Sequence, residues 1–359
     1  MSTRSFAGPI GGVVVSLPSW FPSRSEESSG LRLLSRAPGS TEEPSAAQTA
    51  ATTPDAEWLT TNRAGSFAMG TIDRCPRRKY HSLLTVREPG VGEPLNMVAE
   101  LEEWFDVGED PEIALHSYTW GSRVEPTGID HLERFEPLPR WTYAFAGLSV
   151  TRELWLEDEA DAVWLRYSIE GLTKPVHLRL RPLIHCRPIH KLSTANPFMN
   201  GEIDVEHGES LSVVMHPYKD VPALIASIHG TAASFHADGH WYEGVHYEWE
   251  RARGYDDAED LFTPGEFRVR VEHDGAFCVR IGTTAATSHE PQVLTSVLSS
   301  RRSFVQELDD AADAYLVELQ GERTGVIAGY PWFGEWSRDA LIALPGLCLA
   351  RNEVGKALD

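Results

Sequence analysis

The sequence predicts a large antiparallel β-sandwich that is followed by α-helices. Three observations support this prediction. Apolar and polar residues alternate with a period of two in much of the segment 57–284, as in strands with one buried face. Turn-forming pairs that contain glycine separate these runs. After Pro291 the apolar spacing becomes that of a helix. Many strands over so long a segment favour a sandwich.

The first part of the chain lacks the composition of a folded domain. Residues 1–54 are rich in Ser, Gly, Pro, Ala and Thr, and the stretch 37–54 holds almost no large apolar residue. Such a segment cannot bury enough surface to offset its ordering entropy, so we expect residues 1–54 to form a disordered leader. The apolar run 10–17 is interrupted by glycine and lacks a clear cleavage site, which argues against a secretory signal.

The sandwich is predicted to comprise residues 55–287. The segments 176–181 and 267–272 alternate between apolar and polar residues, and in 163–170 Val163, Leu165, Tyr167 and Ile169 alternate with Trp164, Arg166, Ser168 and Glu170. The pair Asp274-Gly275 lies between 267–272 and a further apolar run, 277–281. We therefore expect these last two segments to pair as a β-hairpin.

The last part of the chain, residues 288–359, is predicted to be helical. One helix of roughly seven or eight turns, at about 3.6 residues per turn, is expected to end at Gly321. A glycine-rich loop follows, and a second helix is expected from near Trp336, kinked or interrupted by Pro345 and Gly346. The first helix is predicted from its spaced apolar residues, which are Val293, Val297, Leu308, Ala311, Ala312, Tyr315 and Leu319.

Composition excludes several classes of partner. The 359 residues include 32 Lys and Arg but 53 Asp and Glu, a formal charge of −21. This charge repels phosphate backbones and anionic lipids, so we expect no nucleic-acid or membrane partner, whereas a neutral glucan is compatible with it. No stretch of 18 apolar residues predicts a membrane-spanning helix.

No metal or cofactor is expected. The four cysteines are far apart and form no C-x-x-C pair, which predicts reduced thiols, a cytoplasmic location and no zinc ribbon. His236, His240 and His246 fit no strong metal-ligand spacing. No Walker loop or dinucleotide fingerprint occurs.

The segment 329–339 is the most informative stretch. Aromatic faces suit the C–H patches of sugars, and charged groups suit their hydroxyls, so the segment is typical of a carbohydrate site. Core packing is the alternative role for its aromatic residues. The candidates lie on a loop that enters a helix, and they are Trp332, Phe333, Glu335, Trp336, Arg338 and Asp339.

Three blocks resemble glycogen-debranching enzymes of the amylo-α-1,6-glucosidase type. The segment 329–347 is similar to the family motif G-Y-P-W-F-x-x-W-G-R-D-x-x-I-x-x-P-G-L. The segment 57–84 is similar to E-W-L-x-x-N…G-T…R-R-Y-H-G-L-L, and 250–265 to E-R-x-R-G-x…E-D-L-x-x-P-G. The chain departs from these motifs at Ser82 and Ser337, where the family has glycine, and at Lys79, which is inserted before Tyr80.

The resemblance implies a fold and a reaction. It implies a β-sandwich followed by an (α/α)₆ toroid, here incomplete, and hydrolysis of the α-1,6-linked glucose at branch points of glycogen or a limit dextrin. Asp339 is the implied general acid, and Trp332, Phe333, Glu335, Trp336 and Arg338 are the implied substrate-binding residues. Inverting hydrolysis requires a second carboxyl group about 6.5–9.5 Å away. In the family this group lies downstream, so we expect the chain to be inactive by itself.

Alternatives stay open at this point. Asp339 also suits a carboxylate that pairs with Arg338 or caps the helix. The chain also suits a glucan-binding β-sandwich without catalysis, or an inactive gene fragment. Two further sets have two possible roles each. The first set could contact sugar or form ion pairs, and its members are Arg77, Arg78, Tyr80 and His81. The second set could stack on glucan or pack in the core, and its members are Trp241, Tyr242, Tyr247 and Trp249.

Overall fold

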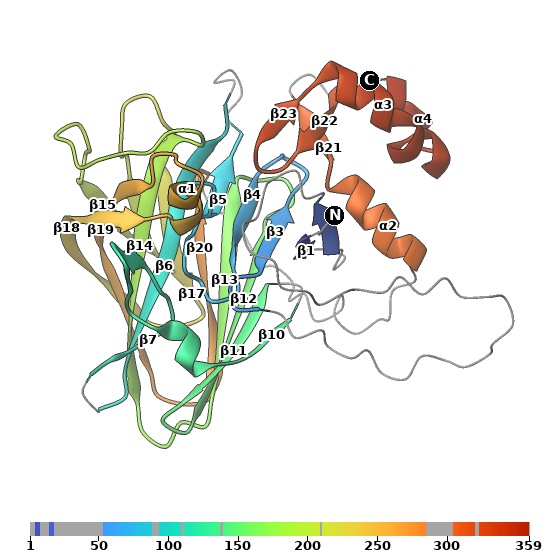
Figure 1. The fold of residues 1–359 in the computed structure, drawn as a ribbon. Helices are drawn as coiled ribbons and strands as arrows, with labels where there is room; N and C mark the ends of the chain where they lie inside the picture. Colours follow the sequence, from blue (N-terminus) through green and yellow to red (C-terminus); the bar gives the residue numbers. More distant parts are fainter. Residues whose placement is uncertain are drawn as a thin grey trace, which may run out of the picture.

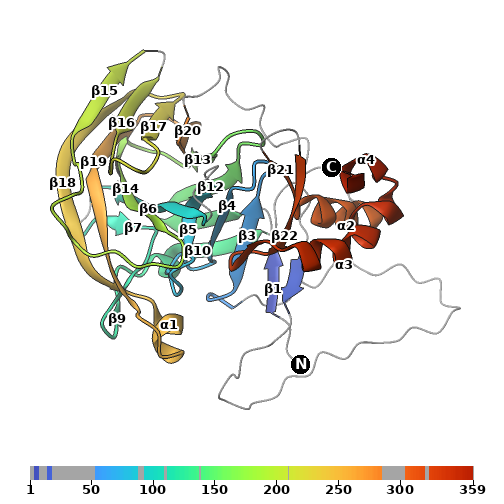
Figure 2. The same cartoon turned by 90° about the horizontal axis from the view of Figure 1, so that it is seen from above.

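A computed structural model describes residues 4–7, 14–17, 53–87, 93–108, 111–136, 139–208, 210–284, 304–319 and 323–358. The fold of these residues is mainly β, as predicted. Two large antiparallel sheets lie face to face, and a small sheet with helices lies beside the first strands of the sandwich (Figures 1 and 2).

The first large sheet has ten strands. Its order is β3-β4-β5-β6-β14-β19-β18-β8-β9, and β7 pairs with β6. The strands are β3 (Glu57–Thr61), β4 (Phe67–Thr71), β5 (Ser82–Val86), β6 (Leu95–Asp106), β7 (Ile113–Ala114), β8 (Thr119–Trp120), β9 (Arg123–Val124), β14 (Val176–Pro188), β18 (Ala233–His246) and β19 (Ala258–Val271).

The second large sheet has eight strands in the order β10-β11-β12-β13-β20-β17-β16-β15. They are β10 (Leu132–Glu136), β11 (Arg140–Phe145), β12 (Leu148–Leu156), β13 (Ala162–Glu170), β15 (Ile203–His207), β16 (Leu211–Met215), β17 (Leu224–His229) and β20 (Gly275–Gly282). The helical pieces associated with the sandwich are the 3₁₀ turn η1 (Gly128–His131) and the short helix α1 (Glu248–Ala252).

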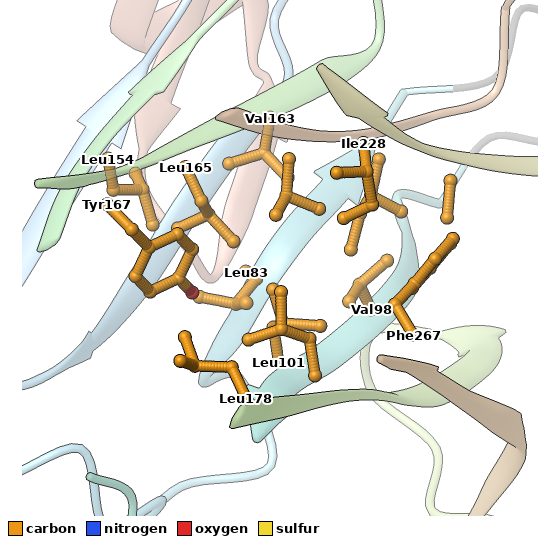
Figure 3. Packing of buried hydrophobic residues seen from close by; sticks show 14 of the residues in the cluster. Leu83, Val98, Leu101, Leu154, Val163, Leu165, Tyr167, Leu178, Ile228 and Phe267 are labelled. Atoms are coloured by element: carbon orange, nitrogen blue, oxygen red, sulfur yellow. The ribbon is translucent and has the colours of Figure 1, made fainter. Parts of the chain in front are cut away.

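The main hydrophobic core fills the space between the two sheets. Alternate residues of each strand point into it, as the period of two predicts. Leu165 and Tyr167 of β13 are fully buried there, as are Leu101 of β6 and Leu178 of β14. Figure 3 shows these side chains packed against one another from both sheets.

A buried ion network joins the sheets inside this core. Arg152 of β12 contacts Glu103 and Glu100 of β6 at 3.0 and 3.1 Å. Arg74 also pairs with Glu103, at 2.7 Å, and the Tyr167 hydroxyl donates to Glu103 at 2.6 Å. Buried charges are costly unless they are paired and hydrogen-bonded, so this network ties one sheet to the other.

The predicted hairpin between 267–272 and 277–281 is wrong. β19 pairs with β14 and β18 in the ten-stranded sheet, whereas β20 pairs with β13 and β17 in the other sheet. The turn at Asp274 therefore carries the chain from one sheet to the other. Alternation and turn residues are local signals and do not specify the strand partner. The turn at His207-Gly208, in contrast, does join two paired strands, β15 and β16.

The single long helix predicted to end at Gly321 is also wrong. Residues 285–303 and Gly321 lie outside the described residues, but α2 (Phe304–Asp313) ends before a strand, β21 (Leu316–Leu319). The expected loop contains β22 (Arg323–Gly329) and β23 (Phe333–Glu335), which complete a three-stranded sheet. Leu316 and Val317 are buried on opposite faces of this sheet, and two adjacent apolar residues fit a helical pattern as well.

The second predicted helix is confirmed. α3 (Ser337–Leu347) begins one residue after Trp336, and Pro345 and Gly346 lie in its last turn. The 3₁₀ turn η3 (Leu349–Arg351) and α4 (Val354–Leu358) follow. The paired strands β1 (Arg4–Ala7) and β2 (Val14–Leu17) lie within the predicted leader, whose remainder up to residue 52 is outside the described residues.

The small sheet lies between the sandwich and α3. One face packs on the sandwich through Val317, Ile327 and Tyr330, which contact Phe67 and Tyr80 among others. The opposite face packs against the helices, in a cluster that includes Leu316, Val326, Leu344 and Cys348. Both views show β21 and β22 between β3 and the helices (Figures 1 and 2). The position of α3 is thus set by packing on the sandwich.

Candidate active site

The aromatic residues of the segment 329–339 have two different environments. Phe333 and Trp336 are 52% and 49% exposed, and their rings meet edge to face with centroids 5.9 Å apart. Trp332 is half-buried and packs on the cluster between the small sheet and the sandwich. Core packing therefore accounts for part of the Trp332 ring, while Phe333 and Trp336 are the more accessible to a ligand.

Asp339 lies in the first turn of α3, three residues after Trp336. Its side chain is 40% exposed, and its carboxylate is 3.4 Å from the Arg338 guanidinium, which in turn lies 5.6 Å from the centre of the Trp336 ring. An exposed ion pair of this kind contributes about 0–1 kcal/mol and leaves the carboxyl group accessible. The edge of α3 thus presents a carboxyl group, a fixed cation and two aromatic rings to solvent.

Glu335 is engaged within the small sheet. Both of its carboxylate oxygens accept hydrogen bonds from Arg323 of β22, at 3.2 and 3.1 Å. Gly325 permits this arrangement, because a Cβ atom there would lie 2.9 Å from a Glu335 oxygen. Of the two acids in the segment, Glu335 therefore has the structural pairing and Asp339 is the more available.

The segment 77–81 meets the loop of Trp332 at Tyr80. The rings of Tyr80 and Trp332 lie edge to face with centroids 6.3 Å apart, and the Tyr80 hydroxyl is 3.2 Å from Nδ1 of His190. Lys79, the inserted residue, has its ammonium group 5.6 Å from the Tyr80 ring and 5.9 Å from that of Tyr255.

The rest of this segment forms ion pairs. Arg77 contacts both carboxylate oxygens of Asp73, at 2.8 and 2.6 Å. Arg78 and His81 both contact Glu57, at 2.7 and 3.0 Å. Burial alone would raise the pKa of Glu57, but the contacts with His81 and Arg78 outweigh it and lower that pKa below its ordinary value. Ion pairing is thus the observed role of these residues, apart from Tyr80.

The segment 249–255 completes the same region. The Arg78 guanidinium lies 4.6 Å from the Trp249 ring, and Arg253 lies 5.0 Å from the Tyr255 ring. Three segments that are far apart in the sequence, 77–81, 249–255 and 329–336, therefore converge where the small sheet meets the sandwich. Sequence reasoning identified each segment separately and did not predict that they meet.

The other aromatic candidates are packed or hydrogen-bonded within the sandwich. The Tyr247 hydroxyl donates to Glu259 at 2.5 Å, and Trp241 packs edge to face on Phe262, with centroids 5.3 Å apart. The Tyr242 hydroxyl donates to Glu102 at 3.0 Å. These contacts favour core packing over glucan stacking for this set.

One chemically important residue was not identified as a candidate. Glu250 of α1 is fully buried, and neither of its carboxylate oxygens has a hydrogen-bond partner among the described residues. It stands within the block 250–265, and that similarity was the only sequence signal for it. An unpartnered buried carboxylate is costly and calls for a functional explanation.

Neither a metal-ligand cluster nor a membrane-spanning helix occurs in the described part of the chain. No group of three or more His, Cys, Asp or Glu side chains there is arranged to hold a metal ion. No helix there has both the length and the apolar character to cross a membrane.

Comparisons with known proteins agree with the three blocks. Residues 56–277 match the family model described as the N-terminal part of glycogen debranching enzyme. Residues 304–358 match the model described as amylo-α-1,6-glucosidase. No curated protein sequence matches the chain.

Two solved structures are similar to the chain at low identity. A bacterial glucoamylase complexed with acarbose is 8% identical over 67% of this chain and 34% of its own, with a TM-score of 0.35. A human-microbiome protein assigned as kojibiose phosphorylase is 11% identical over 71% and 37%, with a TM-score of 0.29. The chain thus spans little more than a third of either protein. Because the first family model covers more than half of the present sequence, the chain belongs to the glycogen debranching enzyme family.

Proposed function

We propose that the protein acts in glycogen debranching, by hydrolysis of the α-1,6-linked glucose at branch points of α-glucans. In this proposal residues 55–287 form the sandwich domain, and residues 288–359 form a linker and the start of an (α/α)₆ glucosidase domain. The observation that carries the proposal is the exposed carboxyl group of Asp339, beside two exposed rings, in the segment that matches the amylo-α-1,6-glucosidase model.

Each residue at the edge of α3 has a role in the proposed reaction. Asp339 donates a proton to the glucosidic oxygen as the bond breaks. Phe333 and Trp336 pack against the C–H faces of glucose units, and Arg338 donates hydrogen bonds to hydroxyls. Trp332 lines the sandwich side of the site, and Glu335 holds β22 and β23 together through Arg323 while accepting from sugar hydroxyls at its exposed edge.

A second carboxyl group is needed to activate the attacking water in an inverting reaction. Among the described residues the charged partner of Asp339 is Arg338, and Glu335 is committed to Arg323. We also propose that the 359-residue chain binds branched glucan but does not release glucose from it by itself.

The role of Asp339 is best tested in a full-length family member. The aspartate that aligns with Asp339 is replaced by asparagine, and glucose released from a phosphorylase limit dextrin is measured. We expect a loss of at least about 100-fold, the lower range for removal of a general acid. A variant that releases glucose at the normal rate excludes this role. The glutamate aligned with Glu335, changed to glutamine, is the comparison and should lose less activity than the aspartate variant, because Glu335 pairs with Arg323 and donates no proton in the proposed reaction.

A glucan-binding protein without catalysis is the second candidate, supported by the exposed rings of Phe333 and Trp336. The 359-residue chain should bind glycogen in affinity electrophoresis under both proposals. Glucose release by this chain would exclude the non-catalytic function and our inference of inactivity together. We also propose a cytoplasmic location, supported by the free, buried thiols of Cys75, Cys186 and Cys348.

A further inference from the structure

We propose a binding site for a linear run of α-linked glucose units on the sandwich, formed by Lys79, Tyr255 and Trp332 around the buried carboxylate of Glu250. The site deepens the function proposed above and rests on it only for the identity of the sugar. It would hold glucose units of the same substrate whose branch-point bond lies at Asp339.

The first argument is the unsatisfied polar chemistry at this place. Both carboxylate oxygens of Glu250 are buried without a hydrogen-bond partner, and so is Nε1 of Trp332. Tyr80 connects the two residues. Its ring contacts Trp332, and after burial itself the charge of Glu250 is the largest influence that raises the pKa of the Tyr80 hydroxyl. Glu250 also lies next to Tyr255, whose backbone amide donates to the Glu250 carbonyl oxygen at 3.1 Å. Buried polar groups are normally paired, so unpaired groups in two segments that both adjoin 77–81 point to a ligand.

The second argument is that the hydroxyls of a sugar chain can both donate to the Glu250 carboxylate and accept from the Trp332 N–H. A hydroxyl donates one hydrogen bond, which a carboxylate such as Glu250 accepts, and it has lone pairs that accept from an indole N–H such as that of Trp332. A bound phosphate would instead bring a negative charge towards Glu250. The carboxylate therefore selects a neutral polyhydroxylated ligand over an anionic one.

The third argument is that the Tyr255 ring lies exposed next to these buried groups. Tyr255 is 55% exposed, and the centre of its ring lies 5.9 Å from the Lys79 ammonium group and 5.0 Å from the Arg253 guanidinium. An aromatic ring with hydrogen-bond donors at its edge suits a glucose unit. Cation–π contacts at exposed sites contribute only about 0.5–1 kcal/mol, so Lys79 can leave the ring at little cost when a sugar binds.

The test is the affinity of the 359-residue chain for maltoheptaose, measured by isothermal titration calorimetry. Tyr255→Ala should weaken binding about tenfold, which corresponds to about 1.4 kcal/mol. Phe198→Ala is the matched control, because Phe198 is an aromatic residue that is 80% exposed and lies outside the three converging segments. It should leave the affinity unchanged.

Glu250→Gln separates a binding role from a structural one. The variant loses a charged acceptor, so maltoheptaose should bind at least about fivefold more weakly, while thermal stability should be unchanged or higher because a buried unpaired charge is removed. Unchanged affinity in both Tyr255→Ala and Glu250→Gln, or no binding of maltoheptaose by the unaltered chain, would overturn the proposal.

The outcome is independent of the glucosidase proposal. Maltoheptaose is linear and contains no branch-point bond, so its affinity for the chain is measured without any reaction at Asp339. If the sugar site fails this test, glucose release by full-length relatives still decides the role of Asp339. If glucose release persists without that aspartate, the binding data still decide the role of Glu250.

Discussion

Glu259→Gln should strongly destabilise the sandwich, because it breaks a buried ion pair. The buried carboxylate of Glu259 accepts hydrogen bonds from Arg187 at 2.7 Å and from Tyr247 at 2.5 Å. The same guanidinium donates to the backbone oxygen of Lys79 at 2.9 Å and so positions the segment 77–81. Removal of the charge leaves Arg187 buried without its counter-ion, which costs about 3–5 kcal/mol when a buried pair is broken.

The pH dependence of this cost follows from the pKa of Glu259. Burial alone would raise that pKa, but the charges of Arg187 and His185 outweigh it and hold the pKa well below its ordinary value. A carboxyl group with a lowered pKa in the folded state stabilises the fold fully above its unfolded pKa, about 4.3, and progressively less below it. The loss is about 1.4 kcal/mol for each pH unit.

Urea unfolding of the chain and the variant at pH 7 and pH 3.5 provides the assay. The free energies of unfolding should differ by about 3–5 kcal/mol at pH 7 and by about 1 kcal/mol less at pH 3.5. Glu272→Gln is the control, because Glu272 forms an exposed pair with Arg270 and should change stability by less than about 1 kcal/mol. A difference that is the same at both pH values would refute the argument for Glu259.

Two further predictions concern the sandwich. Gly265→Ala should lower the free energy of unfolding by about 3–5 kcal/mol, because φ is +141° and a Cβ atom would lie 2.2 Å from the backbone oxygen of His236. Gly121→Ala is the control: φ is +62° but no atom lies within 4 Å, so the loss should be only about 1–2 kcal/mol. Equal losses for the two variants in urea unfolding would contradict this reasoning. Burial raises the pKa of the Cys75 thiol to about 11. Cys75 should therefore react with a thiol reagent such as DTNB far more slowly in the folded chain than in urea. Equal reaction rates would show that the thiol is accessible in the folded chain.

The strands of the sandwich were predictable, but their partners were not. The segment 163–170 alternates and forms β13 as expected, because one face of each strand must be buried. The pair Asp274-Gly275 predicts a turn correctly, yet the strands on its two sides belong to different sheets. A turn signal depends on two or three residues, whereas the choice of sheet depends on the packing of the whole core.

The region before α3 shows a second reason why sequence prediction failed, which is the identity of the element itself. Leu316 and Val317 are adjacent, and each is buried on its own side of the small sheet. Because apolar residues lie on both faces of β21, its pattern does not alternate clearly and is compatible with a helix. The start of α3 was predicted well, because it follows the sharply defined segment 329–336.

Predictability at the candidate site follows the same division. The sequence alone identified Asp339 and its neighbouring rings, since they occupy one continuous segment. It did not identify Glu250, because the property that distinguishes this residue is the lack of a partner after folding. That property depends on how the segments 77–81, 249–255 and 329–336 meet, and no local pattern encodes it.

The two-sided packing of the small sheet has a consequence for catalysis. Val317 of β21 is buried against the sandwich, while its neighbour Leu316 is buried against the helices. The backbone amide of Glu318 also donates to the carbonyl oxygen of Arg63, in the turn between β3 and β4, at 2.9 Å. Because α3 is joined to the sandwich through a packed sheet, groups on the sandwich such as Tyr80 and Lys79 keep a defined position relative to Asp339. A displacement of about 1 Å between reacting groups can reduce a rate about 100-fold, so a packed junction of this kind fits the proposal that one polymer is bound on the sandwich and cleaved at the helix.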